Sequence, residues 1–409
     1  MHKTRSLTLL AVRVATMLSL LGIATGALAA DSEQVLHSFC ILAGCPGGAN
    51  PEGKLIFDST GNLYGATYAG GRHGDGTVFE LISVNGKWRH KLLHSFYGHG
   101  GDGAVPFGGL VADGTGNLFG VTMYGGDFNS CTNVGCGVVF ELLRGTGGTW
   151  TEKVLHTFDD QDGAFPNGPL VFDGSGNLYG TTVIGGTYGK GVAFELVPSN
   201  GTWTLKVLHN FNPNSNDGSE PVSALIFDKA GNLYGATQFG GVYDYGTVFE
   251  LTPNNGTWTE NLLYDFGKDA PDAASPYTNL VFDGAGNLYG AAGGIWEYFG
   301  VIFELLPANG QWVKKVLYRT EKAGPGDVTL DSSGNLYSAS GCECEFQSMV
   351  FELTPGDGKW TKRVLHRFTR PRDGYDPSGP VVFDSSGNLY GLTYYGGATG
   401  NGTVFQIKP

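Results

Sequence analysis

Five aspartates with a shared spacing are the first residues in this chain whose type and position suggest binding chemistry. Each stands four residues before a proline, in segments rich in glycine and other small residues: Asp102/Pro106, Asp162/Pro166, Asp217/Pro221, Asp272/Pro276 and Asp373/Pro377. Carboxylates gathered at one mouth of a protein could hold a cation or bind sugar hydroxyls. The competing interpretation is a turn that leads into the next strand, since Asp and Pro both favour turns.

Aromatic residues occur in a second set of glycine-rich segments: Tyr188, Tyr243, Tyr245, Trp296, Tyr298 and Phe299. Exposed aromatic rings beside carboxylates suit sugars, which offer C–H faces for stacking and hydroxyls for hydrogen bonding. Trp296 is the most informative of them, because the other six tryptophans follow a repeated pattern. We therefore expect ligand binding around Trp296, Tyr298, Tyr243, Tyr188 and the five aspartates. The alternative is that these rings anchor their own loops.

Motifs of established catalytic chemistry are missing. The chain has no G-x-S-x-G, no H-E-x-x-H, no P-loop and no dinucleotide fingerprint. The acidic run Asp159-Asp160-Gln161-Asp162 does not have EF-hand spacing. We expect no cofactor and no metal. Catalysis stays open, because glycoside-cleaving enzymes can use carboxylates that are far apart in sequence.

Six cysteines form three local pairs: Cys40/Cys45, Cys131/Cys136 and Cys342/Cys344. In an exported protein, such pairs predict disulfides. The third pair would close a very small, strained ring, so both its oxidised and its reduced form stay open. A zinc site would need about four ligands brought together, and no pair has a second Cys or His pair nearby.

These candidates lie between copies of one repeated unit. The sequence GNLYG, or a close variant, occurs at 61, 116, 176, 231, 286, 334 and 387, with an Asp three residues before each Gly. A repeat of about fifty residues that fills the chain indicates a propeller or a solenoid. Each unit divides into four short strands, as in 170–173, 177–182, 246–251 and 150–158, and no helical period is sustained.

The register of the outer hairpin follows from its turn. Asn-Gly or Asp-Gly pairs such as Asn85-Gly86 are typical of two-residue hairpins. Counting outward places a Glu opposite a basic residue in most units and Glu250 opposite Asn261: Glu80/Lys91, Glu141/Lys153, Glu195/Lys206, Glu304/Lys315 and Glu352/Arg363. The last unit has Gln406 instead of Glu and stops after its third strand.

The missing fourth strand of that last unit is present at the other end of the chain. Residues 34–39, QVLHSF, resemble the fourth strand KLLHSF at 91–96, with Gln34 at the lysine position. Gln34 and Gln406 would then face each other, and the N-terminal strand would complete the last blade. We therefore predict a closed seven-bladed β-propeller with four-stranded blades.

Residues that recur in every unit are poor candidates for a single site. We assign the VLH histidines (such as His94) to packing or hydrogen bonding on the outer strand, the repeated tryptophans to packing between blades, and the third-strand phenylalanines to the core. The loops that join strands two to three, and blade to blade, share one face. Because these loops are longer and more variable, we expect ligands on that face.

The N-terminus has the features of a secretory signal. Lys3 and Arg5 precede an apolar stretch, and Ala27-Leu28-Ala29 is an A-x-A cleavage site. We expect a signal peptide at 1–29 and the propeller at 30–409, with no membrane span. Removing three basic residues changes the formal charge from −13 to −16, which argues against a nucleic-acid partner. We expect a secreted, periplasmic or extracellular, monomer.

The units FDxxGNLYGxTxxGG…GTVFEL resemble the GloVer-type tandem-repeat family of secreted bacterial proteins, described as choice-of-anchor proteins, over nearly the whole mature chain. More loosely, DxxGNLY is similar to NHL-type propellers. The resemblance implies a secreted propeller and no established activity. Two functions stay open: a non-catalytic binding propeller for an extracellular glycan or protein ligand, and a carbohydrate-active enzyme, either a polysaccharide lyase or a glycoside hydrolase.

Overall fold

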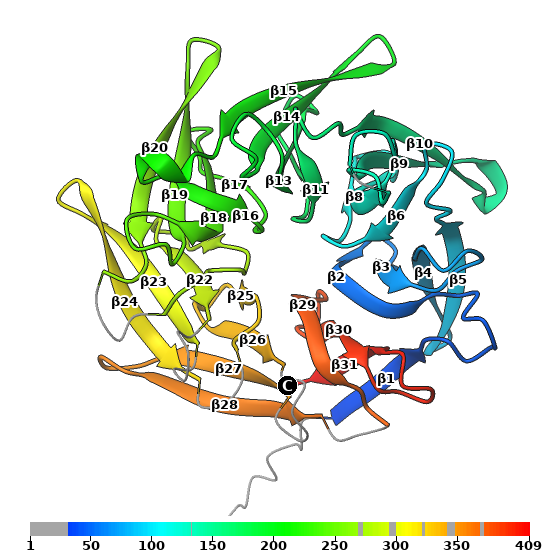
Figure 1. The fold of residues 1–409 in the computed structure, drawn as a ribbon. Coiled ribbons are helices and arrows are strands. Elements are labelled where there is room, and N and C mark those ends of the chain that lie inside the picture. The colour runs from blue at the N-terminus through cyan, green and yellow to red at the C-terminus, as the bar shows by residue number, and fades with distance from the viewer. Residues whose placement is uncertain are drawn as a thin grey trace, which may run out of the picture. The chain divides into compact units, whose positions relative to one another are not determined.

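The structure is a computed structural model that describes residues 32–131, 133–268, 273–293, 300–320, 324–341, 348–368 and 372–409. These residues belong to one compact unit, Asp31–Pro409. The unit is an all-β propeller of seven antiparallel sheets arranged around a common centre (Figure 1). In the described ranges the only helices are the short 3-10 turns η1 (Thr146–Gly148) and η2 (Pro213–Ser215).

We number the blades in chain order from the first complete one, and each is listed from the centre outward. Blade one contains β2 (Ala49–Phe57), β3 (Leu63–Ala69), β4 (Thr77–Val84) and β5 (Lys87–Ser95). Blade two contains β6 (Gly103–Pro106) with β7 (Val111–Ala112), β8 (Leu118–Gly125), β9 (Val138–Arg144) and β10 (Trp150–Thr157). Blade three contains β11 (Ala164–Pro166) with β12 (Val171–Phe172), β13 (Leu178–Ile184), β14 (Val192–Ser199) and β15 (Thr202–Asn210). Blade four contains β16 (Gly218–Pro221) with β17 (Ile226–Phe227), β18 (Leu233–Gly240), β19 (Thr247–Asn254) and β20 (Thr257–Asp265).

The remaining blades follow the same order. Blade five contains β21 (Val281–Phe282), β22 (Leu288–Ala292), β23 (Val301–Ala308) and β24 (Gln311–Arg319). Blade six contains β25 (Val328–Leu330), β26 (Leu336–Ser340), β27 (Met349–Pro355) and β28 (Trp360–Arg367). Blade seven contains β29 (Tyr375–Phe383), β30 (Leu389–Tyr395), β31 (Thr403–Lys408) and β1 (Ser32–Ser38).

The two ends of the chain close the ring in the predicted way. Strand β1 pairs with β31, and Gln34 lies directly opposite Gln406. The amide of Gln406 donates to the Tyr390 hydroxyl at 2.6 Å. The N-terminal strand therefore completes blade seven, and the pairing register confirms the closure inferred from the two glutamines.

A buried polar chain explains why Asp, Asn, Tyr and Glu recur together. In blade one, the backbone N–H groups of Thr60 and Asn62 donate to Asp58 Oδ1 at 2.8 and 2.9 Å. The Tyr64 hydroxyl donates to Glu80 Oε1 at 2.9 Å, and Lys91 Nζ lies 3.3 Å from Glu80 Oε2. Because Glu80 is almost fully buried, this network satisfies a carboxylate that would otherwise be costly to enclose.

The predicted hairpin register is confirmed in every blade in which it was counted. Glu80 faces Lys91, Glu195 faces Lys206, Glu250 faces Asn261, Glu304 faces Lys315 and Glu352 faces Arg363. Blade two keeps the pairing of Glu141 with Lys153, but Lys153 Nζ donates to the Gly201 carbonyl at 2.9 Å. That contact reaches the hairpin of the next blade, so the lysine bridges blades in addition to marking the register.

The repeated aromatic residues pack between blades, as expected. Trp150 of blade two lies edge-on to Tyr64 of blade one, with ring centroids 6.2 Å apart. Phe79 is fully buried, and a Cβ placed on Gly65 would lie 2.6 Å from its ring. The glycine of the repeat is therefore required by the phenylalanine that covers it.

The inner strand differs from the expectation. Its predicted extent in blade three was 170–173, but it starts earlier, at β11, breaks, and resumes at β12. The Asp–Pro segments therefore contain the first part of the inner strand and do not merely precede it. The break arises because the inner strand carries two more residues than its partner, as between Pro106↔Thr122 and Val111↔Phe119.

Two of the predicted disulfides are present. Cys40 is bonded to Cys45, and Cys131 to Cys136. Cys342, Cys344 and residues 1–31, which include the expected signal peptide, lie outside the described residues. No helix in the part of the chain that the structure describes has the length and apolar character needed to cross a membrane.

A pair of double variants tests the closing contact. Gln34→Lys with Gln406→Glu should be tolerated, with a Tm within about 2 °C of the parent, because Tyr390 could donate to the new carboxylate as Tyr64 does to Glu80. Gln34→Glu with Gln406→Glu should lower the Tm by several degrees, since two like charges would face each other. Calorimetry on both variants measures the difference, and equal Tm values would contradict the register.

Candidate functional site

The segment after the blade proline differs in sequence from blade to blade. The residues there are Glu-Gly-Lys at 52–54, Phe-Gly-Gly at 107–109, Asn-Gly-Pro at 167–169, Val-Ser-Ala at 222–224, Tyr-Thr-Asn at 277–279, Gly-Asp at 326–327 and Ser-Gly-Pro at 378–380. In blades one to four and in blade seven, this is where the inner strand carries two extra residues. Such bulges redirect side chains, and here they line the centre of the propeller.

An unusual backbone conformation precedes the proline in six blades. The residue has a positive φ of 53–60° in each case: Asn50, Val105, Phe165, Glu220, Ser275 and Asp376. For a β-branched residue such as Val105 this conformation is strained. Its N–H donates to the Asp75 carbonyl of the preceding blade at 2.8 Å, and Phe165 N–H donates in the same way to Cys136 at 2.9 Å.

The left-handed residue therefore attaches each inner strand to the blade before it. Asn50, Glu220 and Ser275 make the equivalent backbone bonds at 2.7–2.9 Å, and Asp376 N–H donates instead to the Ser348 hydroxyl at 3.1 Å. The inner segments also touch each other directly. Gly53 has a φ of +83°, and a Cβ there would lie 2.5 Å from Gly109 N. This close approach fixes the positions of the variable residues.

Together these segments enclose a cavity of about 400 Å³ to which all seven blades contribute. That volume is within the range of small-molecule sites. Tyr394 and Gln238, near the ends of β30 and β18, also line it. Strands two run toward the variable loops, so the cavity lies in the half of the channel nearer the variable-loop face.

One wall of the cavity is built from amide and carboxylate groups. Asn279 N–H donates to Asp327 Oδ1 at 2.6 Å, and Asn279 Nδ2 donates to Asp327 Oδ2 at 3.2 Å. Asn279 Oδ1 in turn accepts from Ala224 N–H at 2.6 Å. These two side chains join blades four, five and six. Burial raises the pKa of Asp327 to about 6, although the bonds from Asn279 and the charge of Lys54 oppose the rise.

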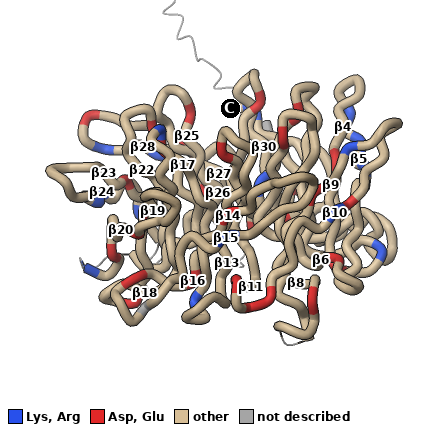
Figure 2. The backbone as a smooth tube through the Cα atoms, turned by 90° about the horizontal axis from the view of Figure 1, so that it is seen from above, with Lys and Arg blue, Asp and Glu red and all other residues tan. Residues whose placement is uncertain are grey.

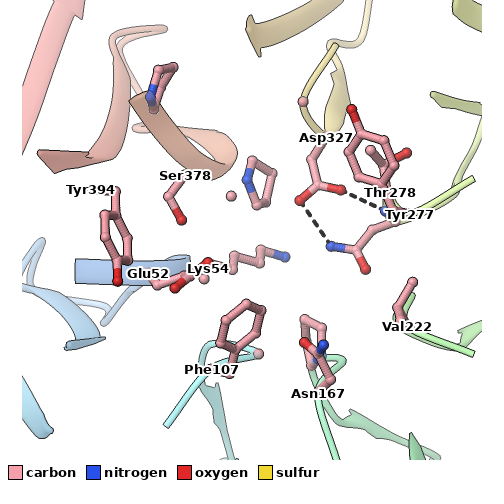
Figure 3. A pocket seen from close by; sticks show the side chains of 18 of the residues that line it. Glu52, Lys54, Phe107, Asn167, Val222, Tyr277, Thr278, Asp327, Ser378 and Tyr394 are labelled. Carbon is pink, nitrogen blue, oxygen red and sulfur yellow. Dashed lines mark hydrogen bonds between the residues drawn. The ribbon is translucent and has the colours of Figure 1, made fainter. Parts of the chain in front are cut away.

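The opposite wall carries a carboxyl group that stays protonated at neutral pH. Burial, reinforced by the nearby Asp376 carboxylate, raises the pKa of Glu52 to about 8. Burial and the charge of Glu52 raise the pKa of Tyr394 to about 12. Figure 3 shows Glu52 on the Tyr394 side of the cavity and the Lys54 side chain reaching into the middle, between Phe107 and Asp327.

Aromatic rings surround the same wall. Tyr68 lies 6.0 Å from Tyr394 and 6.4 Å from Phe107, measured between ring centroids, and both contacts are edge-on. The cavity therefore combines ring faces and edges, a lysine, a neutral carboxyl group and amides. This set can stack on a ligand and can both donate and accept hydrogen bonds.

The sequence-predicted aspartates have partners of their own. His156 Nε2 lies 2.8 Å from Asp162 Oδ2, His209 Nε2 lies 2.7 Å from Asp217 Oδ2, and His366 Nε2 lies 3.1 Å from Asp373 Oδ2. These pairs join the end of a fourth strand to the segment that leads into the next blade. Asp102 lies farther from its histidine, with Oδ1 3.7 Å from His94 Nε2.

None of the predicted site residues that the structure describes lines the cavity, and three of the aspartates bond instead to histidines of the outermost strands. The pairs made by Asp162, Asp217 and Asp373 confirm the hydrogen-bonding role assigned to the VLH histidines. Acidic residues lie in loops at both ends of the strands (Figure 2). Tyr188 and Tyr243 are about half exposed, at 51% and 46%. Trp296, Tyr298 and Asp272 lie outside the described residues, so the ligand-binding role of the whole set stays a prediction.

The cavity residues were not predicted from the sequence, because they belong to no motif and lie outside the long loops. The signal that could have found them is the contrast between an almost invariant repeat and the two or three unlike residues after each proline. Those residues lie more than 300 positions apart at the extremes, as Glu52 and Ser378 do, and only ring closure brings them together.

Comparisons with known proteins identify the repeat family. A family described as the Gloeobacter/Verrucomicrobia repeat matches residues 132–340, and the chain belongs to this family. No curated protein matches the sequence. Because the match covers about half of the chain, it establishes the repeat and leaves the ligand open.

Similar solved structures share the fold at low identity. An ulvan lyase, described as a new family of polysaccharide lyase, has 12% identity and a TM-score of 0.58, and the match covers 92% of this chain and 95% of that one. Virginiamycin B lyase from Staphylococcus aureus has 12% identity and a TM-score of 0.55, with 93% and 99% covered. The extracellular domain of a putative hybrid two-component system from B. thetaiotaomicron has 13% identity and a TM-score of 0.58, with 91% and 39% covered.

The raised pKa of Glu52 predicts a pH-dependent stability. The folded pKa of about 8 exceeds the ordinary value of 4.5, so the folded state binds the proton more tightly than the unfolded state does. Its stability contribution is full below about pH 4.5 and is lost as the pH rises toward 8. Glu52→Gln should therefore leave the Tm nearly unchanged near pH 5 and raise it at pH 9, by about 4–8 °C.

Thermal unfolding of the parent and Glu52→Gln from pH 5 to pH 9 measures this difference. Asp357→Asn is the matched control, because it removes an exposed carboxylate from a turn where other blades carry Asn. Parallel Tm curves for the parent and Glu52→Gln would show that Glu52 is ionised across this range and would contradict the assignment.

Proposed function

We propose that this member of the Gloeobacter/Verrucomicrobia repeat family is an exported binding propeller whose channel cavity holds a neutral glycan. The observation that carries the proposal is the convergence of differing inner segments from all seven blades on one cavity, within blades whose other strands are nearly uniform. Packing alone would be served by equivalent residues in every blade. Seven different segments, in contrast, make an asymmetric surface that can recognise one ligand in one orientation.

The chemistry of the cavity suits a polyhydroxylated ligand. Phe107, Tyr277 and Tyr394 offer ring surfaces to C–H groups, and Lys54, Asn167 and Gln238 offer polar groups to hydroxyls. No hydrogen bond of the Lys54 or Asn167 side chain occurs in the described ranges, and neither is buried. These two side chains are therefore free to change partners when a ligand enters.

The charge of the cavity favours a neutral ligand. Glu52 is protonated at neutral pH, and the positive charge of Lys54 offsets that of Asp327. Asp376 leaves a small negative excess, and the chain as a whole is acidic, at −13. An anionic polymer would meet repulsion both on approach and in the cavity. The two disulfides support export, since such bonds persist in oxidising compartments.

In this proposal the variable-loop face binds the part of the glycan that lies outside the cavity. Tyr188 and Tyr243 are exposed there, and Trp296, Tyr298 and the loop aspartates belong to the same face of the repeat. A glycan whose end occupies the cavity would continue toward these loops. In this proposal the cavity recognises the terminal unit, and the loop aromatics stack on the units that follow.

Glycan-array binding followed by titration tests the proposal. Lys54→Met should weaken the affinity for the best glycan about tenfold with an unchanged Tm, because the exposed lysine can be removed without disturbing packing. Lys229→Met, at an exposed position in a turn on the opposite face, should leave the affinity unchanged. Trp296→Ala locates the outer part of the site. Affinity lost in Trp296→Ala but kept in Lys54→Met would place the ligand on the loops and contradict the cavity.

The pairing of Glu52 with Asp376 favours a second candidate, a glycoside-cleaving enzyme. A protonated carboxyl group beside an ionised one has the arrangement of a general acid with a base or nucleophile. In this case reducing ends should be released from the glycan that binds, and the rate should fall above about pH 8 as Glu52 ionises. Glu52→Gln should abolish release and keep binding, with Asp357→Asn as the control. Binding without release in the parent protein would exclude this candidate.

A further inference from the structure

Each of the seven blade junctions contains an equivalent residue on the outermost strand, away from the channel cavity. In blades one to six it lies two residues after the tryptophan of the fourth strand, and in all seven blades it faces the Leu or Ile of the third strand. The residues at this position, in blades one to seven, are His90, Glu152, Leu205, Glu260, Lys314, Lys362 and Glu33. In five junctions this side chain lies near the VLH histidine, or its tyrosine replacement, of the preceding blade: those with His90, Glu152, Glu260, Lys314 and Lys362. Glu33 lies near Asp373.

The residue type at this position follows the type of its partner. Where the partner is a tyrosine, the residue is a lysine: Lys314 Nζ lies 4.9 Å from the Tyr264 ring centre, and Lys362 Nζ donates to the Tyr318 hydroxyl at 2.9 Å. Where the residue is a glutamate, the partner is always a His–Asp pair. Three junctions therefore contain one histidine, one aspartate and one glutamate.

Two of these three junctions are closed by a direct bond. His209 Nε2 lies 2.7 Å from Asp217 Oδ2 beside Glu260, and His366 Nε2 lies 3.1 Å from Asp373 Oδ2 beside Glu33. The junction between blades one and two is open. There His94 Nε2 lies 3.7 Å from Asp102 Oδ1, and one potential ligand atom each of His94, Asp102 and Glu152 lie within 4.8 Å of one another.

The open junction also leaves buried polar atoms without partners. Within the described part of the chain, His94 Nε2 and Glu152 Oε1 are both buried and make no hydrogen bond, whereas in the closed junctions only the glutamate oxygen, Oε1 of Glu260 or Glu33, lacks a partner. Unsatisfied polar atoms of this kind are costly, and in native proteins they usually have a water or an ion as partner. Two such atoms from different blades, facing a third ligand, indicate a missing group between them.

Asp102 is already oriented as a metal ligand would be. Tyr97 N–H donates to its Oδ2 at 2.8 Å and Gly103 N–H donates to its Oδ1 at 2.7 Å. These bonds hold the carboxylate in place and leave lone pairs on both oxygens, as outer-shell bonds do in metal sites. His94 and Asp102 side chains are 20% and 18% exposed, so an ion and its water ligand can enter.

We propose that His94, Asp102 and Glu152 bind one divalent transition-metal ion, Zn²⁺ by preference, and that the ion clamps blade one to blade two. One imidazole nitrogen with two carboxylate oxygens is a donor set that suits Zn²⁺, with water as the fourth ligand. Zinc–ligand distances near 2.1 Å place ligand atoms about 3.4 Å apart, so the three groups close by about an ångström on binding. Sequence spacing could not reveal the set, because its members come from β5, the following loop and β10.

Titration of the metal-stripped, full-length mature protein with ZnCl₂ tests this site. We expect one equivalent bound at micromolar or tighter Kd, together with a rise in Tm. Glu152→Leu copies the residue that blade three carries at this position, and His94→Tyr copies the residue of blades four and five. Each should weaken Zn²⁺ binding at least tenfold while the apo-protein stays folded by circular dichroism.

The closed junctions provide the control. Glu260→Leu removes the glutamate beside His209 and Asp217 and should leave the stoichiometry and Kd unchanged. Co²⁺ in place of Zn²⁺ should give d–d absorption bands in the parent and in Glu260→Leu, but not in Glu152→Leu. Absence of Zn²⁺ binding in the parent, or an equal Kd in Glu152→Leu, would overturn the proposal and leave a proton shared between Asp102 and Glu152.

Discussion

The hydrogen bond from the residue before the blade proline to the preceding blade is the constraint on which the rest of the propeller depends. To make it, Val105 and its equivalents adopt a positive φ that costs on the order of 1–3 kcal/mol per residue. The proline that follows fixes the next φ and cannot donate to the sheet. The strand therefore breaks at this point, takes two extra residues and turns them toward the channel. Blade-to-blade attachment and the lining of the cavity are two results of the same backbone geometry.

Repeated contacts elsewhere in the blade stabilise the fold, so the residues after the proline can vary. The Asp–Asn–Tyr–Glu network, the edge-on Trp–Tyr contacts and the buried third-strand phenylalanines recur around the ring and hold each blade to its neighbours. None of them uses the residues after the proline. Those residues can therefore differ in every blade, and burial in the channel then shifts the pKa values of Glu52 and Asp327 upward. Stability comes mainly from the repeated residues, and recognition in our proposal comes from the unlike ones.

Much of the fold could be predicted from sequence because its determinants are local. Asn85-Gly86 fixes a two-residue hairpin, the hairpin fixes Glu80 opposite Lys91, and the exchange of that pair for Gln34 and Gln406 reveals the closing strand. The cavity could not be predicted in the same way. The sign of φ at Val105 is not encoded in its residue type, since valine disfavours positive φ, and the conformation is imposed by the neighbouring blade. The Asp–Pro motif was recognised, but three of its aspartates bond to histidines whose positions only the packed ring defines.

A crystal structure of the protein with its best-binding glycan tests the central claim most directly. The account predicts sugar atoms within about 4 Å of Lys54, Phe107 and Asn167, with the next units leading toward the variable loops. The blade backbones should be unchanged, because the strained residues already hold the cavity open. A glycan bound only at the outer loops, around Tyr243, with none of its atoms in the channel, would contradict the account.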